Sequence, residues 1–200
     1  MSSTSATDGL GQHATLRVVG ISAAAALGGF LFGFDTAVIN GAVDAIRGHF
    51  TLGADAIGFT VSCALLGSAL GAWYAGMLAN RFGRVRTMQV AAVLLVAAAL
   101  GSGLATAVRD LILWRLVGGI GVGVASVIAP TYIAEVAPAR IRGRLGSMQQ
   151  LAIVLGIFAA LLSDAWLAGA AGGAASVLWL GMPAWRWMFL VATVPAVIYG

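Results

Sequence analysis

The sequence predicts an all-α membrane protein with six transmembrane helices. Of its 200 residues, 60% are hydrophobic and only 9% are charged, whereas a soluble domain carries about 25% charged residues. The apolar residues also come in blocks of roughly 20, the length that crosses a hydrocarbon core of about 30 Å. Because a backbone in lipid must satisfy its own hydrogen bonds, each block is expected to be a helix.

Six apolar blocks give the expected helices. They cover about 17–39, 57–78, 87–107, 111–134, 146–168 and 185–200. Residues 1–16 are polar and are expected to form a disordered cytoplasmic tail. Residues 169–184 are expected to form an outer loop that lies at the membrane interface through Trp179 and Trp185. The last block stops at Gly200, so the chain is expected to end within a helix or at its edge.

The Arg residues orient the helices, because cytoplasmic loops carry an excess of positive charge. The tail and the second and fourth loops hold Arg17, Arg81, Arg84, Arg86, Arg140, Arg142 and Arg144. The first, third and fifth loops hold only Arg47, Arg109 and Arg186. This distribution places the N-terminus in the cytoplasm. It also explains the net charge of +4 by membrane topology rather than by binding to nucleic acid.

Two charged residues, Asp35 and Arg115, fall inside apolar blocks. An ionisable group in the membrane costs several kcal/mol unless it is paired or lines a wet cavity. The expected helix ends place Asp35 about 8 Å and Arg115 about 6 Å below the outer surface, on antiparallel helices. Asp35 is then either a carboxylate that takes up and releases a proton, or a residue that reaches the headgroups. The pair itself is either functional or a static buried ion pair.

The two Arg-rich loops form a second candidate site. Glu135 ends the fourth block on the cytoplasmic side, where it is expected to reach both Arg clusters in a charge-assisted network that holds an inner gate shut. The alternative is that the Arg residues serve only to orient the helices. The residues of this candidate gate are Gly76, Asn80, Arg81, Gly83, Arg84, Glu135, Arg142 and Arg144.

Other polar and small residues within the blocks have simpler explanations. The run from Gly118 to Gly123 lies in an apolar block with no preceding strand, so it predicts close helix packing rather than a nucleotide-binding loop. Gln149 and Gln150 open the fifth block, and their carboxamides either bond a neighbouring helix or face a polar cavity. The sequence contains no catalytic set and no metal-spaced cluster of His and Cys, so neither enzymatic activity nor a cofactor is expected.

Four stretches, in order, resemble the sugar porter family of the major facilitator superfamily. Gly28–Gly41 resembles the first-helix signature of bacterial sugar/proton symporters, and Gly76–Arg86 resembles the superfamily's loop motif. Arg115–Arg144 and Pro183–Pro195 resemble the family's helix 4 and the start of its helix 6. Asn80 stands where most of the superfamily has Asp, and Val85 replaces a usual Arg. The resemblance covers nearly the whole chain from about residue 27.

This resemblance implies that residues 17–200 are the N-terminal six-helix half of a twelve-helix transporter, built as a 3+3 inverted repeat and truncated in or at the end of helix 6. It implies that Asp35 is the proton-coupling carboxylate and Arg115 its partner. Phe32 and Gln150 match positions that touch the sugar, and Gln149 is a further candidate. Ile157 stands where family members often have a second Gln, which leaves the substrate open.

The expected function is therefore proton-coupled uptake of a sugar across the plasma membrane by alternating access. The expected partners are a sugar or similar small polar solute, a proton, the lipid bilayer and a missing C-terminal half. That half comes from the same gene, from a partner chain or from a second copy. Two alternatives remain: a transporter of another solute, such as a polyol or an organic acid, and a non-transporting membrane fragment that associates with a partner half.

Overall fold

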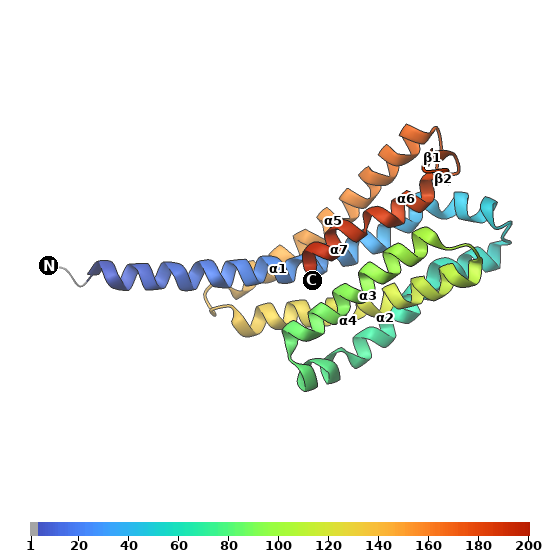
Figure 1. Ribbon diagram of the computed structural model, residues 1–200. Coiled ribbons are helices and arrows are strands. Elements are labelled where there is room, and N and C mark those ends of the chain that lie inside the picture. Colours follow the sequence, from blue (N-terminus) through green and yellow to red (C-terminus); the bar gives the residue numbers. More distant parts are fainter. Residues whose placement is uncertain (1–3) are drawn as a thin grey trace.

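The structure, a computed structural model, describes the backbone of residues 4–200 and side-chain surroundings from residue 26 onward. Five of the described helices are long and apolar enough to cross a membrane. They are α1 (Thr4–His49, apolar from Ala26), α2 (Ala54–Phe82), α3 (Arg84–Leu104), α4 (Val108–Val136) and α5 (Arg142–Ala171). They run side by side, and α1 projects beyond the bundle at its N-terminal end (Figure 1). This arrangement confirms the predicted helical membrane architecture.

The last apolar block forms two short helices rather than the expected continuous one over 185–200. These are α6 (Ala184–Val191) and α7 (Thr193–Tyr199). At the break, the Ala192 N–H donates to the Phe189 carbonyl three residues back, at 3.1 Å. Pro195 has no N–H to donate to the Val191 carbonyl, so the regular helical pattern is interrupted there.

Helix α1 is longer at both ends than the sequence predicted. It continues past the expected end at residue 39 to His49, because Ala42, Ala45 and Ile46 keep a buried apolar face on the bundle. The expected disordered tail of residues 1–16 is helical from Thr4, and residues 1–3 lie outside the described residues. Extending a helix that has already formed is far easier than starting one, which is why a polar segment can continue it.

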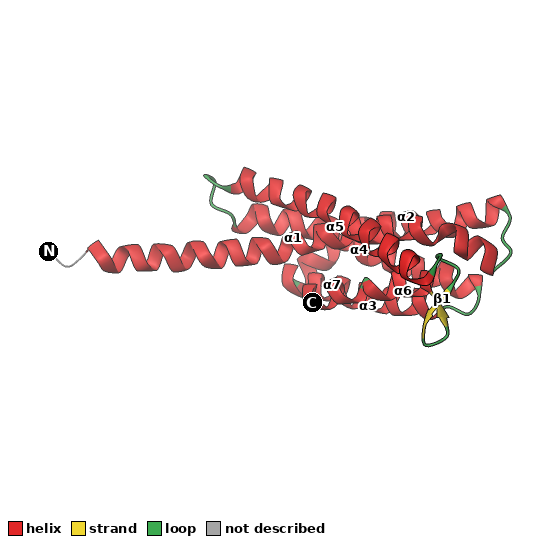
Figure 2. Ribbon diagram, turned by 90° about the horizontal axis from the view of Figure 1, so that it is seen from above, coloured by secondary structure: helices red, strands yellow, loops and turns green. Residues whose placement is uncertain are grey.

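Helices α1 and α4 lie at the centre of the bundle. Helix α2 packs along α4, α5 packs along α1, and the two central helices contact each other. Helix α3 covers α4 and also contacts α6 and α7. Figure 1 shows α2 and α5 on opposite flanks, and Figure 2 gives the view at right angles. The two residues with intramembrane charge predicted from sequence, Asp35 and Arg115, therefore lie on the two central helices.

The contact between α2 and α4 depends on glycine, as the run in α4 predicted. A Cβ atom on Gly119 would overlap the Ala64 carbonyl oxygen of α2, and one on Gly67 would overlap the Leu116 carbonyl oxygen of α4. Small residues let membrane helices approach until their backbones touch, which maximises van der Waals packing where no hydrophobic effect operates. The predicted packing role of the glycine run is confirmed.

Helices α1 and α5 meet in the same way. A Cβ atom on Gly33 of α1 would overlap the Ile153 carbonyl oxygen, and one on Gly156 of α5 would overlap the Phe30 carbonyl oxygen. Each central helix is thus joined to one flanking helix by a reciprocal glycine contact.

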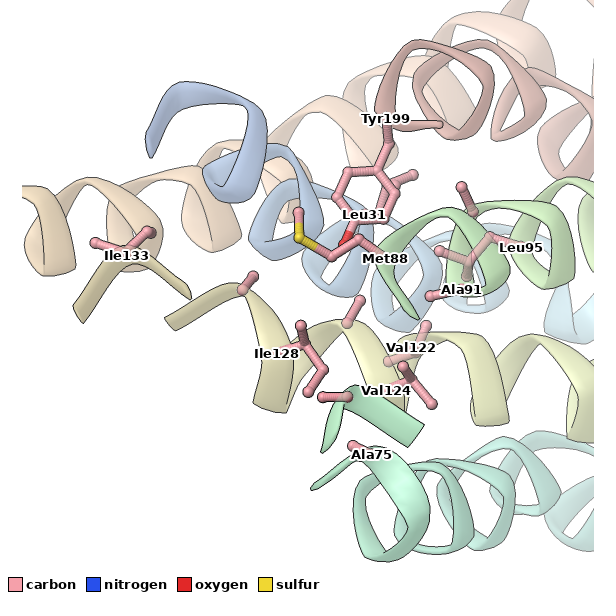
Figure 3. Packing of buried hydrophobic residues seen from close by; sticks show 14 of the residues in the cluster. Leu31, Ala75, Met88, Ala91, Leu95, Val122, Val124, Ile128, Ile133 and Tyr199 are labelled. Atoms are coloured by element: carbon pink, nitrogen blue, oxygen red, sulfur yellow. The ribbon is translucent and has the colours of Figure 1, made fainter. Parts of the chain in front are cut away.

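Two clusters of buried apolar side chains fill the bundle. Figure 3 shows the first, in which Leu31, Met88, Ile128 and Tyr199 converge from α1, α3, α4 and α7. The second cluster, near the opposite end of the bundle, brings α6 against α1 and α4 through Trp185 and others.

The loop after α5 contains a small antiparallel hairpin, which the sequence did not predict. Its strands are β1 (Val177–Trp179) and β2 (Met182–Pro183). Trp179 is largely exposed, as an interfacial residue would be. Trp185 is fully buried, so the prediction that it lies at the interface is wrong. Its ring packs against those of His49, Phe50 and Phe189 instead.

The glycine contact makes a testable prediction. Gly119→Ala should lower the free energy of unfolding by about 1–3 kcal/mol, because the added methyl group forces α2 and α4 apart. Gly58→Ala in α2 is the matched control, since nothing lies within 4 Å of the position of its added Cβ. The control should be neutral or slightly stabilising. Unfolding midpoints in detergent measure both effects, and equal midpoints for the two variants would contradict the packing account.

Candidate functional site

Asp35 and Arg115 form an ion pair between the two central helices. Arg115 Nη1 donates to Asp35 Oδ1 at 3.1 Å. The Arg115 side chain is only 4% exposed, whereas that of Asp35 is 23% exposed. The guanidinium also lies over the Phe189 ring, 5.8 Å from its centroid, a position favoured by the quadrupole of the ring. A buried Arg therefore has one carboxylate partner, and that carboxylate remains open to the cavity described below.

The depth argument that predicted this contact used wrong helix ends. With α1 ending at His49, Asp35 lies about 21 Å from that end, and with α4 starting at Val108, Arg115 lies about 10 Å from its own end. The contact still forms, because the loop between α1 and α2 extends beyond the start of α4.

A cavity of about 250 Å³ opens beside the ion pair, between α1, α2 and α4. Phe32, which the resemblance implies touches the sugar, is one of the residues that line it. Its polar lining consists of Asp35, Thr36, Asn40, Ser62, Ser68 and Arg115. The arrangement offers hydroxyl, carboxamide and charged groups to a small polar molecule in an otherwise apolar surrounding.

Thr36 and Asn40 were missed as site residues by reasoning from the sequence. With Phe32 they follow the spacing i, i+4 and i+8, which places all three on one face of α1. This spacing is visible in the sequence once Phe32 is considered as a candidate site residue. Asn40 lies just past the expected end of the first helix at residue 39. Ser62 and Ser68 give no comparable signal, because isolated Ser residues are common in apolar helices.

The two Gln residues at the start of α5 point to different surroundings. Gln149 is buried, and its side chain packs against Gly29 of α1. Gln150, about 100° further around α5, is exposed, as is Ile157 two turns later. Neither Gln lines the cavity beside Asp35.

At the end of the bundle where α2 meets α3, Arg84 joins three helices. Its Nη2 lies 2.8 Å from Glu135 Oε1 of α4, and its Nη1 donates to Asn80 Oδ1 and to the Ala79 carbonyl oxygen of α2, both at 3.2 Å. The turn before it is made by Gly83, whose φ of +88° suits glycine. The structure thus brings together four of the predicted gate residues: Asn80, Gly83, Arg84 and Glu135.

The other predicted gate residues lie outside this cluster. The expected contact of Glu135 with the second Arg cluster is not formed: Arg142 Nη2 donates to the Ala137 carbonyl oxygen at 3.3 Å. The last carbonyl groups of a helix lack intrahelical partners, and a nearby Arg satisfies one here. Arg81 lies over the ring of the adjacent Phe82. Arg144 is exposed. A Cβ atom on Gly76 would meet nothing within 4 Å, so close packing does not explain why glycine stands at this position of the motif.

These features define a multi-pass membrane protein with a polar, charge-paired cavity inside its helix bundle, as in a transporter. The chain belongs to the family described as sugar (and other) transporter, whose sequence profile matches residues 21–199. This match confirms the resemblance to the sugar porters. The family is made up of transporters, which is consistent with the expectation that the protein is not an enzyme.

Individual relatives agree with the family. The glucose transport protein of Synechocystis sp. is 62% identical over 181 residues, which cover 90% of this chain and 39% of the relative. The arabinose-proton symporter of Bacillus subtilis is 39% identical over 188 residues, covering 94% of this chain and 40% of the relative. The chain therefore spans about 40% of the length of these curated relatives.

The fold is that of the major facilitator superfamily. The structure of the proton:xylose symporter XylE bound to 6-bromo-6-deoxy-D-glucose matches with a TM-score of 0.85 and 36% sequence identity. The match covers 92% of this chain and 44% of that one.

The cluster around Arg84 can be tested by charge reversal. Arg84→Glu and Glu135→Arg should each lower the midpoint of unfolding only slightly, because the two side chains are 31% and 44% exposed and water screens the pair. The double variant should recover most of the loss, because it restores an opposite-charge pair. Arg86→Glu, at an exposed position of the same helix, is the control. A double variant no more stable than either single variant would exclude a direct pair.

Proposed function

We propose that this chain is the N-terminal half of a secondary active transporter that couples the uptake of a sugar to a proton by alternating access. The observation that carries the proposal is the Asp35–Arg115 pair, because it sets a partly accessible carboxylate beside a polar cavity within a membrane bundle. Intramembrane carboxylates of this kind mark proton pathways in transporters. Two relatives, a glucose transport protein and an arabinose-proton symporter, support sugar as the cargo class.

In this proposal Asp35 carries the coupled proton. Protonation of Asp35 removes the negative charge that neutralises Arg115, and this weakens the contact between α1 and α4. A sugar that enters the cavity beside Phe32 touches the same two helices. Proton binding and sugar binding therefore act on one contact, and by linkage each changes the affinity for the other.

The proposed half has the 3+3 inverted repeat of its superfamily, with α1–α3 related to α4–α6 and α7. In such a repeat, α1 corresponds to α4 and α2 corresponds to α5. The contact between α2 and α4 therefore corresponds to the contact between α5 and α1. Both contacts are reciprocal glycine contacts, made by Gly67 and Gly119 in one and by Gly156 and Gly33 in the other. This internal symmetry supports the repeat, and with it the counting of α6 and α7 together as a sixth helix.

The second half is proposed to cover α2 and α5 and to complete the substrate site. These helices expose large apolar side chains, among them Leu65, Leu66, Leu70, Trp73, Tyr74, Leu151, Leu155 and Phe158. The cavity of about 250 Å³ is also smaller than the roughly 300–1,000 Å³ of most small-molecule sites, as expected if half of the lining is supplied elsewhere. The missing half is encoded by the same gene, by a partner chain or by a second copy.

The proposed location is the plasma membrane, with the N-terminus in the cytoplasm. The distribution of Arg residues supports this orientation, and it puts Asn80, Arg84 and Glu135 on the cytoplasmic side. Their contacts are proposed to hold the inner gate shut and to break when it opens.

A second candidate function keeps the mechanism and changes the cargo to another small polar solute, such as a polyol or an organic acid. The observation that favours it is Ile157, an apolar side chain exposed on the same face of α5 as Gln150. A binding screen across hexoses, pentoses, polyols and organic acids distinguishes the two candidates.

The coupling role of Asp35 is tested with Asp35→Asn in the full-length protein reconstituted in vesicles. Sugar accumulation against a gradient should be lost, while exchange of sugar down a gradient persists, because the neutral amide mimics only the protonated state. Asp44→Asn, on an exposed position of the same helix, should accumulate sugar as the wild type does. Accumulation that survives Asp35→Asn would show that another group couples the proton.

A direct sugar contact of Gln150 is tested with Gln150→Ala. Loss of one hydrogen bond worth about 0.5–1.5 kcal/mol should raise the KM for sugar by roughly 2–10-fold. Gln89→Ala, at an exposed position of α3, is the matched control and should leave KM unchanged. Equal KM values for Gln150→Ala and the wild type would remove Gln150 from the site.

A further inference from the structure

A second carboxyl group, that of Asp164, lies buried inside the bundle and has no part in the proposed transport cycle. Asp164 is on α5, about 10 Å along the axis before the helix ends at Ala171. It is 4% exposed. Neither of its carboxylate oxygens has a hydrogen-bond partner. Buried polar groups are nearly always hydrogen-bonded, so two such oxygens on one side chain require an explanation.

The side chain fits against the backbone of α1 at Gly41. A Cβ atom on Gly41 would lie 2.6 Å from both the Cβ and the Oδ2 of Asp164. The contact therefore needs glycine at position 41 of α1. The close approach of the two helices there encloses the carboxyl group of Asp164. Gly41 follows Asp35 on the same helix, so α1 carries one carboxyl that pairs with α4 and packs at Gly41 against a second carboxyl from α5.

No charged group in the described part of the chain pairs with Asp164. On α1, Asp35 pairs with Arg115, while Asp44, Arg47 and His49 are exposed near the end of the helix. On α6, Arg186 donates to the Ala105 carbonyl oxygen at 2.9 Å. The remaining charged residues of α4 and α5 are Arg109, Asp110, Glu135, Arg142 and Arg144, and β1 has none.

An ionised carboxylate in these surroundings would have no counter-charge, and the backbone N–H of Gly41 beside it would offset only part of its desolvation. The free-energy penalty of several kcal/mol for such a group in a membrane interior is avoided when it binds a proton. Water that reached the carboxyl through an opened α1–α5 contact would remove most of that penalty. We propose that Asp164 is a second proton-binding carboxyl, which holds its proton while α5 packs on Gly41 and releases it when this contact opens to water.

The proposal is tested by infrared spectroscopy of the protein in lipid bilayers, which separates the carbonyl stretch of a protonated carboxyl from carboxylate bands. At about pH 7, near neutrality where an ordinary Asp is ionised, the wild type should show a protonated-carboxyl band. Asp164→Asn should lose this band. Asp44→Asn, at an exposed position on α1, should retain it. A neutral-pH spectrum without the band, or a band that survives Asp164→Asn, overturns the proposal.

Gly41→Ala provides a second variant that keeps Asp164 itself. The added methyl group should force the α1–α5 contact open, so that the band disappears at a pH lower by about one unit or more than in the wild type. An unshifted midpoint would show that the contact does not control the proton. Neither measurement requires transport, so the outcome is independent of whether Asp35 couples a proton to sugar uptake.

Discussion

Arg115 holds a positive charge among apolar helices, and the arrangement of the bundle centre follows from the need to neutralise it. A single buried guanidinium in a membrane is strongly unfavourable, and removing one member of a buried pair costs about 3–5 kcal/mol in soluble proteins. Asp35 supplies the opposite charge at 3.1 Å. Because these residues lie on α4 and α1, their pairing requires the two helices to be neighbours.

The glycine contacts are what make this pairing possible without loosening the bundle. Helices α2 and α5 approach the central pair until backbones touch, at Gly119 and Gly156 among others. Such close contacts leave little freedom for the flanking helices to move independently. The structure therefore combines two rigid helix pairs, α2 with α4 and α1 with α5, with a charge contact between them. Motion that changes the Asp35–Arg115 contact moves one pair relative to the other.

The sequence predicted the helices and the central ion pair because both depend on strong, local signals. Apolar blocks specify helices in lipid. Charged residues inside such blocks are rare, so Asp35 and Arg115 could be matched as a pair from the sequence. Features that depend on how the helices pack in three dimensions could not be predicted from the sequence. The burial of Trp185, the extension of α1 to His49 and the burial of Gln149 but not of Gln150 depend on which neighbour each helix meets. The bond from Arg142 to Ala137 depends on a turn geometry that motif spacing does not reveal.

The central claim is that the cavity beside Asp35 and Arg115 couples a proton to sugar movement. Its most direct test is the simultaneous measurement of sugar uptake and internal pH in vesicles that contain the full-length protein, with no proton gradient imposed. Addition of external sugar should acidify the vesicle interior in a fixed ratio to the sugar that enters. Sugar entry with no change in internal pH would contradict the account.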